Sequence, residues 1–177
     1  MNIDLQIIRA QLTPAKQCGA AVVEFAVLLF LLLIIVAGIV EFGRTFWYYD
    51  ALTKATRDGA RFMSTVTVDK IGSTANELTP PPLTSGGKCV TTSYSYTAKN
   101  IVYCAVVAAN VPGFNISDVD VSCDGATCVD DTKPQYIKVS IDAYPVKIGS
   151  WIPFVGLVGA PWDVTLSPST TMRYMLQ

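Results

Sequence analysis

Cysteine is the residue type whose number and spacing suggest chemistry most directly in this sequence. The 177 residues include five cysteines, of which one precedes a long apolar run and four follow it: Cys18, then Cys89, Cys104, Cys123 and Cys128. An even set on one side of such a run indicates disulfides in an exported, oxidising compartment. Four cysteines allow three connectivities. Among these we expect Cys89–Cys104 and Cys123–Cys128, since the last two cysteines are close enough to staple a hairpin turn.

Other chemistries find little support in the residue types. The sequence has no histidine, which excludes Ser-His-Asp and Cys-His catalysis and every His-based metal site. The cysteine spacings lack the paired short knuckles of a zinc site, and the cluster of acids from Asp118 to Asp131 departs from a calcium loop at Ser122 and Gly125. We therefore expect no enzyme, no metal, no cofactor and no small-molecule substrate.

Charge and apolar content limit further which class of protein this can be. Thirteen Lys and Arg stand against 14 Asp and Glu, a balance without the basic footprint of a nucleic-acid-binding protein. Apolar residues make up 51 % of the chain and charged residues only 15 %, whereas roughly 25 % is usual for soluble domains. The excess apolarity must therefore be concentrated in one part of the chain.

That part is residues 20–40, AAVVEFAVLLFLLLIIVAGIV, in which Glu24 is the one charged residue. A helix of this length rises about 30 Å, which is enough to cross a bilayer. A cleaved secretory signal would have a shorter apolar core, of about 7–15 residues, so the run predicts a transmembrane helix. A carboxylate inside an apolar helix is costly. Glu24 is therefore either functional or near enough to the membrane surface to reach water.

The orientation follows from the cysteines. Lys and Arg occur on both sides of the run, so the positive-inside rule does not decide. The even cysteine set places the long C-terminal part outside the cytosol. We predict a single-pass protein with a cytoplasmic N-terminus and a periplasmic or extracellular C-terminal domain.

The residues at the head of the run add a family resemblance. The stretch Gly19-Ala20-Ala21-Val22-Val23-Glu24-Phe25-Ala26 resembles the processing site of type IV prepilins, particularly the TadE-like branch of the tight-adherence (Tad/Flp) pilus system. The later stretch 56–61, TRDGAR, is similar to an "A-R-x-G-A-R"-like stretch of that family. The resemblance implies cleavage by a prepilin peptidase between Gly19 and Ala20. Residues 1–19 would then be a leader, and Cys18 would leave with it.

The same resemblance implies a role in assembly. Cleavage would create a positively charged amino terminus at Ala20, and Glu24 of one subunit could face that charge on its neighbour in a bundle of helices. Phe25 belongs to the same assembly segment. The implied function is a minor pilin, or pseudopilin. Its implied partners are the bacterial inner membrane, the prepilin peptidase, pilins and sister pseudopilins, and the inner-membrane assembly platform. The alternatives are an unrelated single-pass periplasmic binding domain and a type II secretion minor pseudopilin, although small Ala20 points away from the latter.

The elements after the anchor predict an α+β fold. Residues 41–63 continue as an amphipathic helix, with a packed face at spacings of 3 and 4: Tyr48, Leu52, Ala55, Gly59 and Phe62. Residues 64–88 are loop-like, and residues 98–109 fit either a short helix or a buried strand. Alternating runs at 119–123, 136–144 and 164–174 predict strands. We expect a pilin-like plan, in which the long helix packs on a small antiparallel sheet within an ectodomain at 64–177.

One further apolar segment, residues 148–162, is broken by glycines and two prolines and is too short to cross a membrane. It fits a loop packed over the sheet edge, or an exposed patch that contacts the membrane or a partner subunit.

Overall fold

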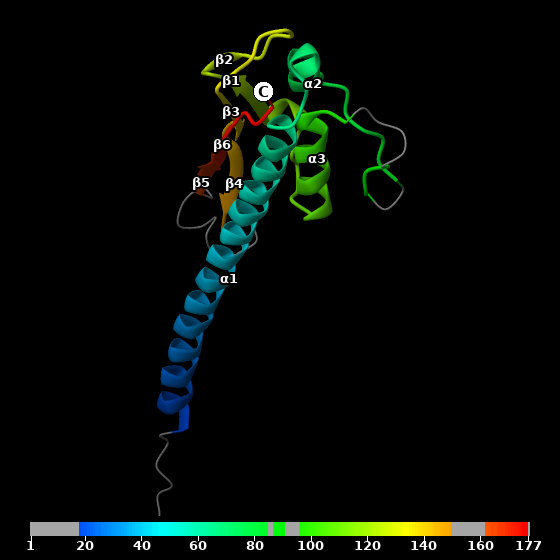
Figure 1. Cartoon of the computed structure of the whole chain (residues 1–177). Helices are drawn as coiled ribbons and strands as arrows, with labels where there is room; N and C mark the ends of the chain where they lie inside the picture. Colours follow the sequence, from blue (N-terminus) through cyan, green and yellow to red (C-terminus); the bar gives the residue numbers. More distant parts are fainter. Residues whose placement is uncertain (1–17, 85–86, 91–95, 150–161, 177) are drawn as a thin grey trace, which may run out of the picture. The chain divides into compact units, whose positions relative to one another are not determined.

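The computed structural model describes residues 18–84, 87–90, 96–149 and 162–176. The chain divides into two compact units, Met1–Val40 and Glu41–Gln177. A single long helix, α1 (Cys18–Met63), supplies the described part of the first unit and the first element of the second (Figure 1). Of the apolar segment 148–162, the structure describes only residues 148, 149 and 162. Its predicted role therefore lies outside the described residues.

Within the second unit, α1 buries one face in the core of the domain. Leu52, Ala55, Ala60 and Met63 are fully buried, at spacings that put them on one side of a helix. The helix ends at Met63. The hydroxyl of the next residue, Ser64, donates to the carbonyl of Arg61 at 2.7 Å. The predicted amphipathic face of this part of the helix is therefore the face that packs.

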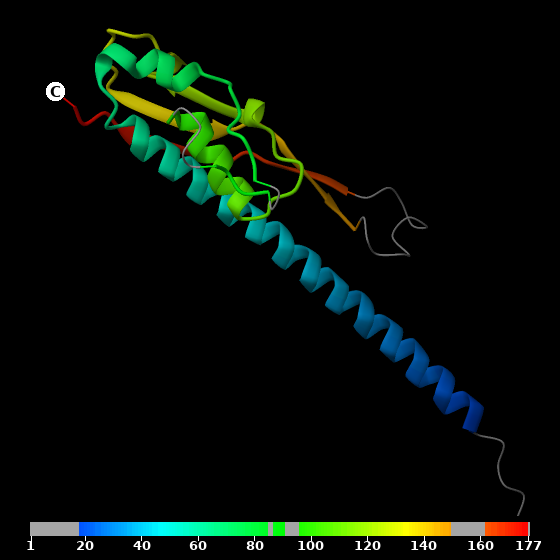
Figure 2. The same ribbon diagram turned by 90° about the vertical axis from the view of Figure 1, so that its right-hand side faces the viewer.

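The main sheet is antiparallel and has four strands: β1 (Val119–Cys123), β2 (Ala126–Thr127), β3 (Tyr136–Ile141) and β6 (Ser169–Arg173), in the order β2-β1-β3-β6. Val121 and Val139 are register partners on the buried face. Figure 2 shows the helices and the sheet from the side. The α+β class predicted from the sequence is confirmed.

A second, two-stranded sheet is formed by β4 (Tyr144–Ile148) and β5 (Trp162–Leu166). The sequence suggested one strand over 136–144 and one run over 164–174, and each is divided between the two sheets. Ala143, with a φ of 46°, bends the chain between β3 and β4. Pro168, whose carbonyl accepts from the Ile141 amide, lies between β5 and β6. Period-2 alternation keeps its phase from Leu166 to Met172, so it does not mark the bend at Pro168. At Ala143 the buried positions shift by one residue, from Val139 and Ile141 to Tyr144 and Val146.

The segment 98–109, which the sequence left open between helix and strand, is the helix α3 (Ala98–Ala108). The Thr97 side chain caps it by accepting from the Asn100 amide at 3.2 Å. α3 packs on α1 at Gly59, where a Cβ atom would lie 2.6 Å from a methyl of Val102. The absence of a side chain at Gly59 permits this close approach.

The loop-like reading of residues 64–88 missed two short helices, η1 (Val68–Lys70) and α2 (Ile71–Asn76). A further 3₁₀ turn, η2 (Ile116–Asp118), precedes β1. Ile71 and Ala75 are fully buried, so packing against the rest of the domain stabilises α2. A helix of this length is unstable alone, and the local sequence therefore gave little sign of it.

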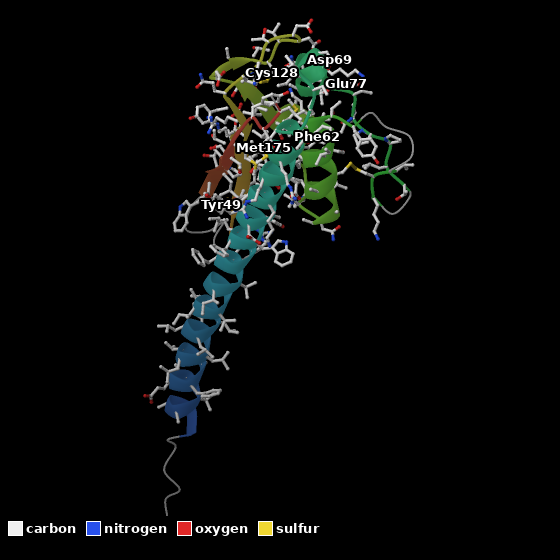
Figure 3. All side chains as sticks on the ribbon, in the orientation of Figure 1. Tyr49, Phe62, Asp69, Glu77, Cys128 and Met175 are labelled. Carbon is white, nitrogen blue, oxygen red and sulfur yellow. A yellow bond between two sulfur atoms is a disulfide. The ribbon has the colours of Figure 1, made fainter. Side chains whose placement is uncertain are left out.

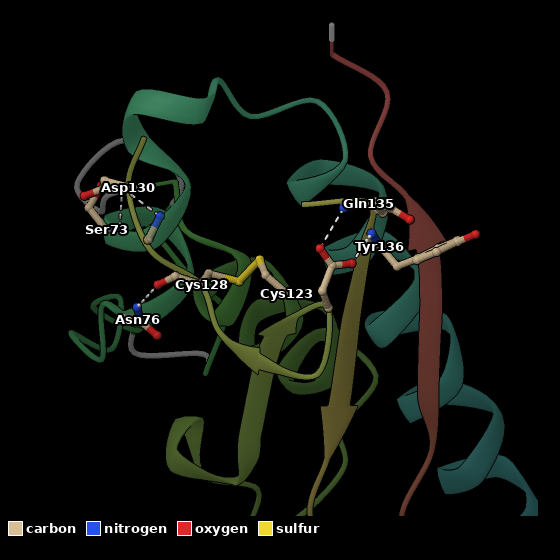
Figure 4. The surroundings of a disulfide bond; sticks show 9 residues. Ser73, Asn76, Cys123, Cys128, Asp130, Gln135 and Tyr136 are labelled. Atoms are coloured by element: carbon tan, nitrogen blue, oxygen red, sulfur yellow. Dashed lines mark hydrogen bonds between the residues drawn. A yellow bond between two sulfur atoms is a disulfide. The ribbon is translucent and has the colours of Figure 1, made fainter. Parts of the chain in front are cut away.

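The second disulfide holds the segment that α2 packs on (Figure 4). Cys123 and Cys128 are joined across the β1–β2 turn, with Cα atoms 4.9 Å apart. Beyond it, the Asp130 carboxylate accepts from the amides of Gly72 and Ser73 at 2.7 and 3.1 Å. The tethered turn thus binds the N-terminus of α2 through backbone and side-chain hydrogen bonds.

Candidate functional site

The apolar part of α1 is the most distinctive feature of the molecule. Helix Gly19–Met63 is long and apolar enough to cross a membrane, and its most apolar window is not buried at all within the structure. Its Leu, Ile, Val and Phe side chains project into open space along the whole run (Figure 3). A soluble domain does not leave such a surface in water, so this part of the helix is suited to be a single-pass membrane anchor.

The four residues predicted for processing and assembly all lie in the first turns of this helix. Ala20 and Glu24 are four positions apart, so they lie one above the other on the same face. Glu24 and Phe25 are both exposed. Among the residues that the structure describes, Gly19 has no neighbour within 4 Å of the position that a Cβ atom would take. The local structure thus leaves all four residues accessible to a peptidase or to a neighbouring helix.

A different carboxylate marks the point at which the apolar run ends. Glu41 follows Val40 directly, yet only 2 % of it is exposed. One of its oxygens accepts from Arg44 Nη2 at 2.8 Å, and the other accepts from the Gly149 amide at 3.1 Å. Arg44 Nη2 also donates to the carbonyl of Lys147 at 3.1 Å. We call these four residues the junction cluster.

The junction cluster ties the end of β4 to the start of the domain's helix. A buried carboxylate without donors would be strongly destabilising, and here both of its oxygens have them. The Arg44 guanidinium also lies 5.9 Å from the ring centre of Tyr48, within the range of a cation–π contact. The position of the β4–β5 hairpin against α1 is therefore fixed by charge-assisted hydrogen bonds.

Tyr144, at the start of β4, adds a second attachment for the hairpin. Its hydroxyl donates to the carbonyl of Pro112. Burial raises the pKa of the Tyr144 phenol, and the nearby Tyr48 adds to the rise, while Arg44 opposes it. The phenol therefore stays protonated and able to donate throughout the physiological pH range.

Sequence reasoning missed the junction cluster. It predicted an amphipathic helix over residues 41–63 and gave Glu41 and Arg44 no role of their own, whereas Glu41 is buried and paired with Arg44. A Glu–Arg pair directly after an apolar run was the available signal. Its partners, Lys147 and Gly149, are far away in the sequence, and only the folded hairpin brings them to the helix.

The predicted cysteine set is arranged as two disulfides, Cys89–Cys104 and Cys123–Cys128. A nearby acidic side chain hydrogen-bonds to the backbone. The Asp124 carboxylate accepts from the amides of Gln135 and Tyr136 at 2.9 and 2.8 Å. Within the described part of the chain, no three His, Cys, Asp or Glu side chains gather as ligands for a metal ion.

Comparison with known protein families gives one match. Residues 19–61 match the family described as TadE-like protein. Neither a comparison with curated proteins nor one with solved structures finds a match. The match covers the apolar run and most of the amphipathic helix, the parts whose motifs carried the resemblance. It confirms that resemblance, and residues 62–177 lie outside the match.

Proposed function

Taking the chain as a TadE-like protein of the Tad pilus system, we propose that it is a membrane-anchored pseudopilin, or minor pilin. In this role it takes part in the assembly of Flp/Tad pili and in tight adherence. The role is structural and involves no catalysis or cofactor. Its partners are a prepilin peptidase, pilins and sister pseudopilins, and the inner-membrane assembly platform.

One observation carries the proposal. A helix with a wholly exposed apolar half and a single carboxylate near its start continues directly into a folded domain with its own core. Such a helix can lie in a membrane, and it can equally pack against parallel copies in a fibre. An anchor alone would not need a charge in its apolar half, because that charge is costly in lipid.

The position of Glu24 supports an assembly role for that charge. After cleavage beside Gly19, the amino group of Ala20 would carry a positive charge one helical turn from Glu24. A neighbouring helix staggered by one turn, about 5.4 Å, would place its amino group against this carboxylate. The pair would neutralise two charges that are otherwise stranded in apolar surroundings.

Processing is tested by the intact mass of the membrane-extracted protein, with and without a co-expressed prepilin peptidase. We expect loss of residues 1–19 in the presence of the peptidase, and none in a Gly19→Val variant. Gly38→Val is the matched control, since Gly38 also lies in α1 with no neighbour within 4 Å of an added Cβ. An unprocessed chain in the presence of active peptidase would leave the single-pass binding protein as the better description.

The assembly role is tested by Glu24→Gln, which keeps the shape of the side chain and removes its charge. We expect normal processing and membrane insertion but loss of co-purification with the pilins of the same system. If co-purification were unchanged, Glu24 would be a residue that merely reaches water at the membrane surface.

A further inference from the structure

We infer that the second unit rests on the lipid surface through a collar of exposed aromatic side chains, to which the β4–β5 hairpin contributes Trp162. The collar consists of Phe42, Phe46, Trp47 and Tyr49 on α1 together with Trp162 on β5. Its partner is the headgroup region of the bilayer that the apolar run crosses. The inference needs only the membrane anchor of the proposed function, not the pilus role.

The helical part of the collar begins directly after the apolar run. Phe42 is 73 % exposed, Phe46 64 % and Trp47 62 %. Phe42, Phe46 and Tyr49, at spacings of 4 and 3, follow one flank of the helix. Trp47 lies on a different side of the helix, so the exposed aromatic residues are not confined to one side. Trp and Tyr concentrate at membrane–water interfaces because their rings are both apolar and polar.

The hairpin brings a fifth aromatic residue to the same level. Trp162 is the register partner of Ile148 at the end of the β4–β5 pair. The next residue after Ile148 is Gly149, whose amide donates to Glu41 at 3.1 Å. The end of the hairpin is therefore beside the first residue after the apolar run. Trp162 is 76 % exposed there, so the described residues of its own domain leave most of its surface uncovered.

The junction cluster explains why this level is the membrane boundary. Its charges are costly to place in the hydrocarbon, as is any charged residue at the centre of a membrane helix. The uncharged run below them, residues 20–40 apart from Glu24, is about as long as the hydrocarbon is thick. Both features place the boundary within about a turn of Glu41, at the start of the collar, which extends about 12 Å along α1 to Tyr49.

Lipid accounts for the collar better than a protein partner does. A protein interface would present a contiguous patch on one face of the domain. The collar instead occupies two sides of α1, within about 12 Å of Glu41 along the helix, and the described end of the β4–β5 pair. A lipid surface beside Glu41 can contact residues on different sides of α1 and on the hairpin together, which a single patch on a partner protein cannot.

The test uses full-length protein in vesicles of phosphatidylcholine and phosphatidylglycerol, with phosphatidylcholine brominated at shallow or deep positions of its acyl chain. The chain has three tryptophans, so Trp47→Phe and Trp151→Phe leave Trp162 alone. Because interfacial rings lie near the headgroups, we expect shallow bromines to quench about half of the Trp162 emission and deep bromines to quench less.

Two matched variants, each with a single tryptophan in a background that also carries Trp162→Phe, control the result. Tyr136→Trp reports from the other end of the domain, because the Gln135 carbonyl accepts from Tyr174 and the Met175 amide donates to Ser64. That end is about 33 Å along the helix from Glu41, and we expect no quenching there. Leu32→Trp reports from the anchor and should be quenched most by deep bromines.

The outcomes separate the inference from the anchor itself. Deep quenching of Leu32→Trp with no quenching of Trp162 would overturn the collar and leave the anchor standing. A blue-shifted Trp162 emission without bromine quenching would mean that a second protein covers the residue, which also overturns it. If Leu32→Trp were not quenched either, the anchor and the collar would both be wrong.

Discussion

At the scale of single residues, two ion pairs on the same helix differ in burial. This difference decides how much each pair contributes to the stability of the domain. Glu41 pairs with Arg44 at 2.8 Å and is almost fully buried, whereas Asp50 pairs with Lys54 at 2.6 Å with both side chains more than half exposed. Solvent screens the second pair, so its shorter distance does not make it the more important one.

We predict that Glu41→Ala destabilises the second unit by about 2 kcal/mol, because it leaves the Gly149 amide without its acceptor and removes the carboxylate that pairs with Arg44. Asp50→Asn, the control on the exposed pair, should change stability by less than about 0.5 kcal/mol. The measurement is urea denaturation of the full chain in detergent micelles, followed by near-ultraviolet circular dichroism. Equal effects of the two substitutions would mean that the junction cluster does not hold the hairpin.

At the scale of elements, the contact between α2 and the turn after Cys128 depends on one glycine. A Cβ atom on Gly72 would lie 2.7 Å from the Asp130 nitrogen and 2.9 Å from the Cys128 oxygen. Both are backbone atoms, and the Cys123–Cys128 disulfide limits how far this turn can move. The clash cannot be relieved by rotating a side chain.

Gly72→Ala should therefore cost about 2 kcal/mol, the range of an overpacked core. Gly43→Ala, also in a helix but with no neighbour within 4 Å, should be neutral or up to about 1 kcal/mol more stable, since alanine favours helix. Thermal unfolding of the two variants under one set of conditions compares them. A stabilising Gly72→Ala would show that α2 is free to move away from the turn.

At the scale of the whole molecule, the two disulfides and the proposed cleavage together fix the number of free thiols. Four of the five cysteines are paired, and Cys18 lies on the leader side of Gly19. The precursor and the processed protein must therefore differ in thiol content.

We predict one alkylated cysteine in the unreduced, denatured precursor and none in the processed chain, as counted by the mass added by iodoacetamide. A Cys18→Ser precursor is the control and should add none. Two or more alkylated cysteines in protein extracted from the membrane would show that at least one disulfide does not form in the compartment that holds the domain.

The sequence by itself determined the features that depend on contiguous residues. These features are the apolar run, its single carboxylate, the amphipathic continuation to Met63 and the α+β class. Each follows from local composition and periodicity, because the residues that form one face of a helix or strand are close together in the sequence. The motif around Gly19 and Glu24 is equally local. The prediction of the family therefore depended on the same short stretch that the family comparison matches.

Only the tertiary structure decided which charge is buried and where the strands divide. Glu24 lies near the start of the apolar run and Glu41 directly follows its end. Of the two, Glu41 is buried, because Gly149 and Lys147 reach the helix from more than a hundred residues away in the sequence. The bend at Ala143 and the docking of α2 on Asp130 likewise depend on contacts between distant segments. Long-range contacts of this kind are set by packing and chain closure, which no local pattern records.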